Sequence, residues 1–169
     1  MGRCAVVKPI IHLDDVVLEH HTHGDKFEAR DGSVGAAIGA RQLGCSLTVV
    51  PPGKRAYPFH NHHVNEEMFI VLEGTGIVRI GATEHAIRAG DVIVTPAGGA
   101  DTAHQIVNTS DRELRYLSVS TMIPMDVIEY PDSSKFAVRV GSPPGGDPAL
   151  RTFNLVAKSV ASVGYWEDE

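Results

Sequence analysis

Cysteines are scarce in this sequence, and long apolar runs are absent. The two cysteines, Cys4 and Cys45, form no Cys-x-x-Cys pair, which excludes the usual spacing of a redox or zinc motif. We expect both to be structural thiols in a reducing cytoplasm and not a disulfide. No apolar run is long enough to span a bilayer, and the first residues lack the apolar core of a secretory signal. The expected location is therefore cytoplasmic.

Positive charge is also in deficit. The chain carries 15 Lys and Arg against 21 Asp and Glu, a formal net charge of −6. Nucleic acids and anionic membranes bind preferentially to basic surfaces, so we expect neither as a partner. The expected partner is a small-molecule substrate or ligand. With 169 residues, of which 43% are hydrophobic, the chain is long enough for one domain with one core.

No window in the central region shows a sustained helical period. Short runs rich in Val, Ile, Leu, Thr and aromatic residues recur instead between turn sequences, at 45–50, 67–74, 76–81, 91–97, 104–108 and 113–121. Strands of this length and spacing predict an all-β sandwich or barrel. Outside these runs, residues 1–33 are compatible with an extra strand, a helical turn or an arm, and residues 124–150 with a broken extended segment.

The segment FHNHHVNEE combines three histidines with two glutamates. On a strand, alternate side chains share a face, so His60 and His62 would form a chelating pair and His63 would point away. A carboxylate at the start of the next strand could reach the same point. Because both faces of that strand are apolar, parity alone leaves Glu66 and Glu67 both open.

This segment resembles the first signature of the cupin superfamily, which has a glycine, a His-x-His pair, a glutamate and a second glycine. The matching residues are Gly53, His60, His62, Glu67 and Gly74. The resemblance favours Glu67 as the ligand, since its spacing to the histidines and to Gly74 fits and that of Glu66 does not. The interval between Gly53 and His60 is one residue longer than usual.

A second cupin signature follows in the expected order. Its matching residues are Gly90, Pro96, Gly98, His104 and Asn108. This resemblance implies that His104 is a fourth metal ligand and that Asn108 orders a turn. The loop GADTA before His104 is longer than usual. Together the two signatures cover about residues 44–121.

The resemblance implies a single-domain double-stranded β-helix, that is, a jelly-roll barrel of antiparallel strands. We expect residues 1–43 to form an N-terminal arm of the same domain, 44–121 the barrel core, and 122–169 an extension that packs on the barrel or on a partner subunit. We also expect a homodimer, because pairing between subunits would hide exposed strand edges.

The implied ligand set has three imidazoles and one carboxylate, from His60, His62, Glu67 and His104. Such a mixed set suits one divalent transition metal, namely Fe, Mn, Ni, Co or Zn, and leaves positions open for substrate. A second His-x-His pair, His21 and His23, lacks a carboxylate at the right spacing. We expect no second metal site there.

The wider sequence resembles a group of small bacterial cupins of unassigned function, some of which carry a provisional sugar-phosphate isomerase label. The leading hypothesis is therefore a metal-dependent enzyme acting on a small polar metabolite, with sugar-phosphate isomerisation as the named candidate. A metal-dependent dioxygenase and a non-catalytic sensor of a small ligand are the alternatives. No catalytic residue can be assigned, and the candidate substrate-binding residues are Lys54, Arg55, Tyr57, Phe59 and Gln105.

Overall fold

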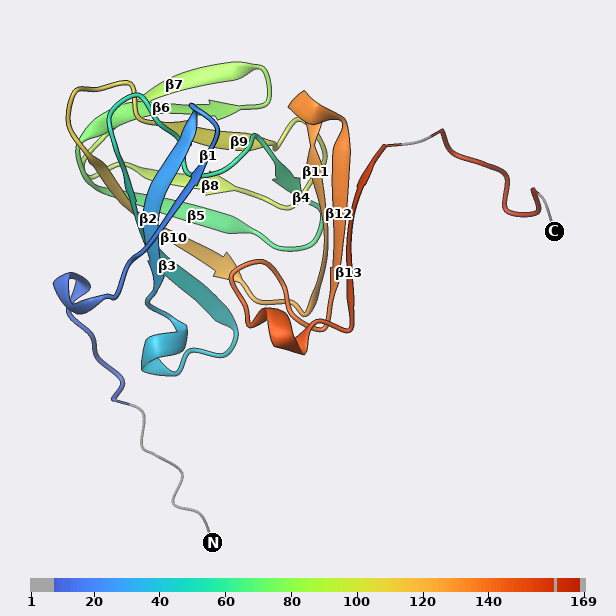
Figure 1. Ribbon diagram of the computed structural model, residues 1–169, viewed down its shortest axis with the longest axis horizontal. Coiled ribbons are helices and arrows are strands. Elements are labelled where there is room, and N and C mark those ends of the chain that lie inside the picture. Colours follow the sequence, from blue (N-terminus) through green and yellow to red (C-terminus); the bar gives the residue numbers. More distant parts are fainter. Residues whose placement is uncertain (1–7, 160, 168–169) are drawn as a thin grey trace, which may run out of the picture.

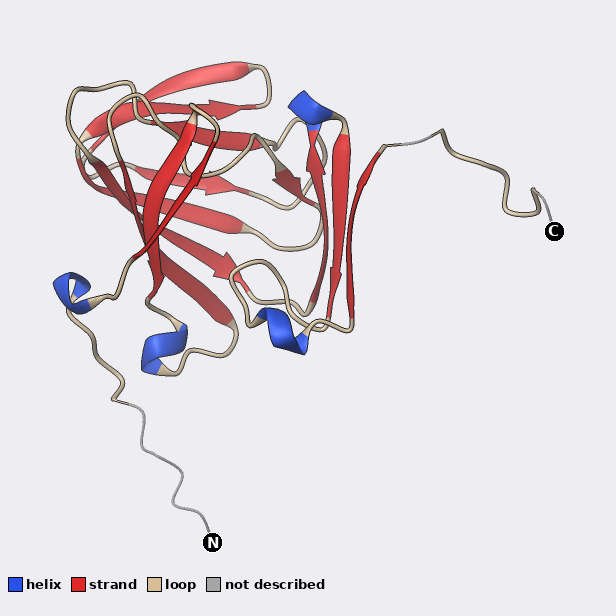
Figure 2. Ribbon diagram, in the orientation of Figure 1, coloured by secondary structure: helices blue, strands red, loops and turns tan. Residues whose placement is uncertain are grey.

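The computed structural model describes residues 8–159 and 161–167. Cys4 lies outside these residues. The described chain consists almost entirely of antiparallel strands, joined by turns and by short 3-10 helices (Figure 2). The predicted all-β fold is confirmed. None of the helices in the described ranges is long and apolar enough to cross a membrane.

The elements follow one another along the chain in this order. The strands are β1 (Glu19–His23), β2 (Phe27–Ser33), β3 (Leu43–Val50), β4 (Asn61–His62), β5 (Glu67–Glu73), β6 (Thr75–Ile80), β7 (Thr83–Arg88), β8 (Val92–Thr95), β9 (His104–Val107), β10 (Leu114–Thr121), β11 (Met125–Tyr130), β12 (Lys135–Val140) and β13 (Phe153–Lys158). The 3-10 helices are η1 (Leu13–Asp15), η2 (Ala36–Ile38), η3 (Pro131–Ser133) and η4 (Pro148–Leu150).

The strands form three antiparallel sheets. The largest has the order β1-β2-β3-β10-β5-β8, the second β13-β12-β11-β4 and the third β7-β6-β9. In Figure 1, β6, β7 and β9 form one layer of the barrel, and β11, β12 and β13 stand together on one side next to β4. Because β4 pairs with β11, the C-terminal strands close the barrel beside the His-x-His motif.

Each apolar run predicted as a strand overlaps an observed one, but β7 was not predicted. Its sequence TEHAIR has a single buried residue, Ile87. A strand with so little apolar surface gives no alternating pattern, and the pairing with β6 holds it in the sheet.

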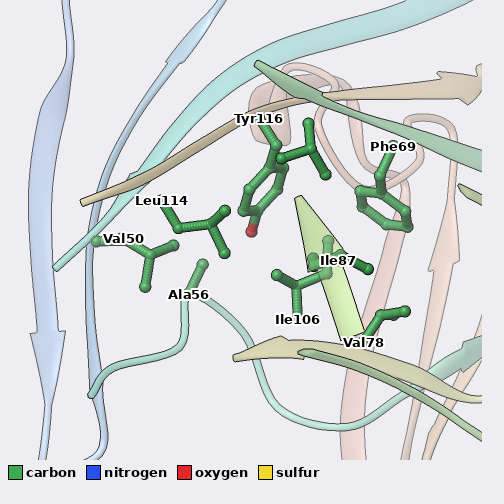
Figure 3. Close-up of a cluster of buried hydrophobic side chains, with 10 residues drawn as sticks. Val50, Ala56, Phe69, Val78, Ile87, Ile106, Leu114 and Tyr116 are labelled. Carbon is green, nitrogen blue, oxygen red and sulfur yellow. The ribbon is translucent and has the colours of Figure 1, made fainter. Parts of the chain in front are cut away.

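The main core fills the space between the sheets. Its buried residues are Ala29, Val50, Ala56, Phe69, Val71, Val78, Ile87, Ile106, Leu114 and Tyr116 (Figure 3). The rings of Phe69 and Tyr116 meet edge to face with centroids 6.0 Å apart, a favoured aromatic geometry. Phe69 also contacts the ring of His104 at 5.3 Å, so this core ends at the predicted metal ligands.

A smaller apolar cluster lies on the other face of the large sheet. Val16 of the N-terminal segment packs there with Val34 and Leu47. Burial of each such side chain contributes about 1.5–3 kcal/mol. The N-terminal segment therefore covers the outside of the barrel and leaves the barrel interior free.

Gly74 explains why the first motif ends in glycine. Its φ is +85°, and a Cβ at this position would lie 2.4 Å from the carbonyl oxygen of Glu113. Positive φ and close backbone approach are both conditions that only glycine meets without strain. The tight turn between β5 and β6 depends on it.

The C-terminal sheet exposes apolar side chains. Met125, Phe153 and Leu155 are each 40–52% exposed, and β13 is the edge strand of its sheet. Exposed apolar edges are surfaces that proteins commonly cover. The homodimer expected from the sequence stays a prediction.

Candidate metal centre

The backbone places His60 and His104 side by side. The His60 N–H donates to the His104 carbonyl at 3.1 Å, and the His104 N–H donates to the His60 carbonyl at 2.7 Å. Residues joined in this way by an antiparallel bridge carry their side chains on the same face, and the two rings lie 4.6 Å apart. His62 follows in β4 on the same face, with its ring 5.0 Å from that of His60.

Glu67 opens β5 with its side chain directed inward. Phe69 and Val71 follow on the same face and are buried. Glu66 is exposed, and its backbone N–H donates to the Thr121 hydroxyl. The structure therefore separates the two glutamates that parity alone left open and turns Glu67 toward the histidines.

Three imidazoles converge on one carboxylate oxygen, Glu67 Oε2. It lies 2.9 Å from His104 Nε2, 3.5 Å from His62 Nε2 and 4.0 Å from His60 Nε2. The donor atoms of His60, His62 and Glu67 all lie within 4.8 Å of one another. His104 joins this group through its contact with Glu67.

The hydrogen bonds of the three imidazoles test whether this group could hold a metal. Each Nδ1 faces an acceptor: the Pro58 carbonyl for His60 at 2.8 Å, the Asp126 carboxylate for His62 at 2.7 Å and the Thr102 carbonyl for His104 at 3.3 Å. In the metal-bound state, with the ring proton on Nδ1, each Nε2 would offer a lone pair that points into the site. His62 Nε2 is buried without a hydrogen-bond partner among the described residues. The donor set thus fits a divalent metal.

Asp126 is a site residue that the sequence analysis missed. It lies in β11, is buried, and also accepts from the Val64 backbone N–H at 3.1 Å and from the Asn65 amide at 3.0 Å. A carboxylate behind a histidine fixes the tautomer and the ring orientation of a metal ligand. The alternation in MDVIEY was the available signal, since it places Asp126 on the same face as the buried Ile128.

Charges within the group set its ionisation. Burial alone would raise the pKa of Glu67, but the hydrogen bond from His104 and the nearby imidazoles lower it to about 2. Burial, followed by the charge of His104, lowers the pKa of His60 to about 4. Burial also acts to lower the pKa of His62, yet Asp126 and Glu67 outweigh it and raise the pKa. At neutral pH the site therefore presents an ionised carboxylate and a neutral His60.

The four side chains lie in a cavity of about 450 Å³. Its lining includes Tyr57, Gln105, Tyr116 and Tyr130 as well as serines of β3 and β10. Pockets of about this size hold small metabolites. A metal at the histidines would therefore face a space that admits a small polar ligand.

The five candidate substrate-binding residues lie in different places. Tyr57 and Gln105 line the cavity. The Lys54 ammonium donates to the Asp25 carbonyl and lies 3.6 Å from Glu28. Neither Lys54 nor Arg55 is among the residues that line the cavity, although an Arg55 guanidinium nitrogen, Nη1, lies 3.4 Å from the Gln105 side-chain oxygen.

Phe59, the last of the five, is buried under the guanidinium of Arg79, which lies 3.6 Å from the ring centroid. It is not among the residues that line the cavity either. The structure thus brings only two of the five candidates into the cavity that contains the predicted metal ligands.

The remaining histidines of both His-x-His segments have other partners. His63 points away from the site and lies 3.1 Å from the Glu129 carboxylate. His21 lies 3.0 Å from Asp31 and stacks on Tyr57. Among the described residues, the cluster at His60, His62 and Glu67 is the one group with metal-ligand spacing.

Asn108 orders the turn before β10. Its amide donates to the Val50 and Arg112 carbonyls, and its oxygen accepts from the Ser110 N–H. This is the turn-ordering role expected from the sequence.

Comparison with known proteins gives one family match and three similar proteins. Residues 46–120 match the cupin domain family. A solved structure of a provisionally named sugar phosphate isomerase from Acidithiobacillus ferrooxidans is similar over 93% of this chain and 97% of that one, with a TM-score of 0.77 and 25% identity. An uncharacterised protein from Methanocaldococcus jannaschii is 26% identical over 114 residues, which are 68% of this chain and 79% of that protein. An oxalate-binding protein from Thermotoga maritima is 31% identical over 74 residues, 44% of this chain and 58% of the relative.

Proposed function

Residues 46–120 form a cupin domain, and from this premise we propose that the protein is a metal-dependent isomerase of phosphorylated sugars. The observation that carries the proposal is the convergence of His60, His62, Glu67 and His104 in a cavity of metabolite size. The similarity to the Acidithiobacillus protein over nearly the whole of both chains supports the choice of substrate.

The chemistry of aldose–ketose isomerisation requires a polarised carbonyl and a group that moves a proton between adjacent carbons. A divalent metal, when bound, supplies a Lewis acid for the carbonyl oxygen. The acceptors at the three Nδ1 atoms would orient the imidazoles for that metal, and Glu67 would offset part of its charge. The chain must then supply the proton carrier from the cavity wall.

Asp31 is the candidate proton carrier. Of the described residues that line the cavity, only Asp31 and Glu67 are carboxylates, and Glu67 is engaged with the histidines. Asp31 accepts from the Tyr57 hydroxyl at 2.9 Å and lies 3.0 Å from His21. These contacts fix its orientation, and the neighbouring His21 can share the proton.

Proton exchange tests the proposal directly. Metal-loaded protein incubated in D2O with a panel of aldose and ketose phosphates should incorporate deuterium next to the carbonyl, as followed by proton NMR. Asp31→Asn should reduce this exchange about 10²- to 10⁴-fold at unchanged metal content. Asp25→Asn, which alters an exposed turn, should have no effect. Absence of exchange with every sugar phosphate would refute the isomerase.

The oxalate-binding relative supports a second candidate, a non-catalytic cupin that holds a small anion. It differs from the isomerase in one measurable respect. Tight binding of oxalate to the metal-loaded protein, without turnover of sugar phosphates, would favour it. Oxygen uptake with an organic substrate would favour the dioxygenase instead.

The metal affinity is expected to fall with decreasing pH. Asp126 and Glu67 raise the pKa of His62, so as pH falls its Nε2 takes up a proton already above the usual His pKa of about 6.5. A metal must displace that proton in order to bind. Below this pKa, affinity should drop about tenfold per pH unit. His60, with a pKa of about 4, should not contribute above pH 5. Chelator competition between pH 8 and 5 measures this, and a constant affinity would contradict it.

A further inference from the structure

Two arginines of the C-terminal extension line the same cavity as the metal ligands. Arg139 lies in β12, and Arg151 follows η4. Arg139 is the cross-strand partner of Asp126, and alternation along β12 places it on the face of the buried Ala137. Its guanidinium is therefore directed into the barrel, where the sequence analysis had looked to Lys54 and Arg55 for cations.

Hydrogen bonds to neutral oxygens hold both guanidinium groups in place. Arg151 Nε donates to the Ser142 carbonyl and Nη2 to the Pro143 carbonyl, each at 3.2 Å. Arg139 Nη1 donates to the Asn154 side chain and to the Leu155 carbonyl. A guanidinium has five N–H donors, so each arginine keeps several of them available for a ligand.

Among the residues that the structure describes, neither guanidinium pairs with a carboxylate. Other cations do have carboxylate partners: Arg30, Arg79 and Arg115 form ion pairs with exposed acidic residues, and Lys54 pairs with Glu28. In the part of the chain that the structure describes, Arg139 and Arg151 have no carboxylate oxygen within 4.0 Å. Burial and the charge of Arg139 lower the pKa of Arg151, and only Asp147 acts in the opposite direction. Two guanidinium charges thus line the same cavity, close enough for one to act on the other.

Tyr130 connects the arginines with the metal ligands. Its ring stacks on that of His60 with centroids 6.1 Å apart. Arg139, on the neighbouring strand, is close enough for its charge to act on the Tyr130 hydroxyl. Tyr130, His60 and both arginines line one continuous cavity. A ligand with one end at the histidines can therefore place its other end at Arg139 and Arg151.

We propose that Arg139 and Arg151 bind the phosphate group of the substrate, while its carbonyl end faces the histidines. A phosphate monoester carries a charge of about −1.5 to −2 at neutral pH, which two guanidinium groups balance, and arginine pairs match its oxygens in bidentate geometry. A ligand with a single carboxylate would leave the charge of one guanidinium group unbalanced. This inference rests on the proposed function and names the group by which that substrate is recognised.

Calorimetric titration with inorganic phosphate tests the assignment on the metal-loaded protein. Arg139→Gln and Arg151→Gln should each weaken phosphate binding about 10- to 100-fold, the loss expected for hydrogen bonds to a charged group. Arg88→Gln is the matched control, because Arg88 is exposed on β7 and does not line the cavity. It should bind phosphate as the unaltered protein does. Arg151→Lys keeps the charge and should lose less affinity than Arg151→Gln.

The outcomes separate this inference from the isomerase itself. Circular dichroism and metal content identify a variant that has lost its fold. If a glutamine variant does not fold, the phosphate affinity of Arg151→Lys tests the assignment instead. Unchanged phosphate affinity in both glutamine variants, no phosphate binding by the unaltered protein, or equal binding of acetate would each overturn the assignment. None of these measurements requires turnover, so a failed isomerase assay leaves a positive phosphate result standing.

Discussion

Glu67→Gln should remove the bound metal, and Glu66→Gln should leave it in place. The two residues are adjacent and chemically identical, but Glu67 Oε2 lies 2.9–4.0 Å from three imidazole nitrogens, and Glu66 is exposed. An amide is a neutral and weaker ligand, so Glu67→Gln removes the negative charge that offsets the metal. Loss of a ligand should reduce affinity by more than the roughly 10- to 100-fold that a change behind a ligand causes.

Metal analysis of both variants, purified in parallel without chelator, measures the effect. Glu66→Gln is a matched control because it makes the same chemical change one residue away. Retention of metal in Glu67→Gln together with its loss in Glu66→Gln would refute the assignment. Loss in both would show that the substitution acts through folding, which urea denaturation would reveal.

The sequence was sufficient for the barrel, because strands that pack one face into a core carry an apolar pattern that can be read directly. It was also sufficient for the position of His60 and His62, since two-residue spacing on a strand has one geometric outcome. It could not choose between Glu66 and Glu67 by parity, because Met68 and Phe69 are both apolar although only Phe69 is buried.

What the sequence could not predict depends on long-range pairing. Asp126 reaches His62 because β11 pairs with β4, and Arg139 enters the cavity because β12 pairs with β11. The contact between Asp126 and His62 joins residues 64 positions apart, and the place of Arg139 depends on it, because β12 follows β11 in the sheet. The local pattern of this segment indicates only an extended chain. Lys54 and Arg55 were nearer to the motif in sequence, yet neither lines the cavity.

Asp126→Asn is expected to weaken metal binding and to destabilise the fold at the same time. Asp126 is 1% exposed and contacts three groups: the His62 ring, the Val64 N–H and the Asn65 amide. An asparagine in its place must direct an NH2 group toward at least one of these donors. The unpaired donors cost about 1–3 kcal/mol, and the His62 ring loses its fixed tautomer.

The pH dependence of folding identifies the charge of Asp126 as the cause. Burial alone would raise its pKa, but the hydrogen bonds from His62 and Asn65 lower it below the usual value. A carboxyl with a lowered pKa in the folded state stabilises the protein above its unfolded pKa of about 3.9, and this contribution is lost as pH falls through the folded pKa. Urea denaturation of Asp126→Asn should therefore differ most from the unaltered protein near neutral pH, and the difference should shrink in acid.

Asp132→Asn is the matched control for both effects. Asp132 also pairs with a cation, Arg79, at 2.9 Å, but its side chain is 53% exposed, and an exposed pair contributes at most about 1 kcal/mol. Metal affinity in Asp126→Asn should fall about 10- to 100-fold, while Asp132→Asn should keep it. If Asp126→Asn lowered stability but bound metal with unchanged affinity, Asp126 would hold β11 to the barrel without orienting His62. If Asp126→Asn loses both stability and metal affinity while Asp132→Asn keeps its metal affinity, the C-terminal strands must position a metal ligand. The carboxylate that does so lies outside both cupin motifs.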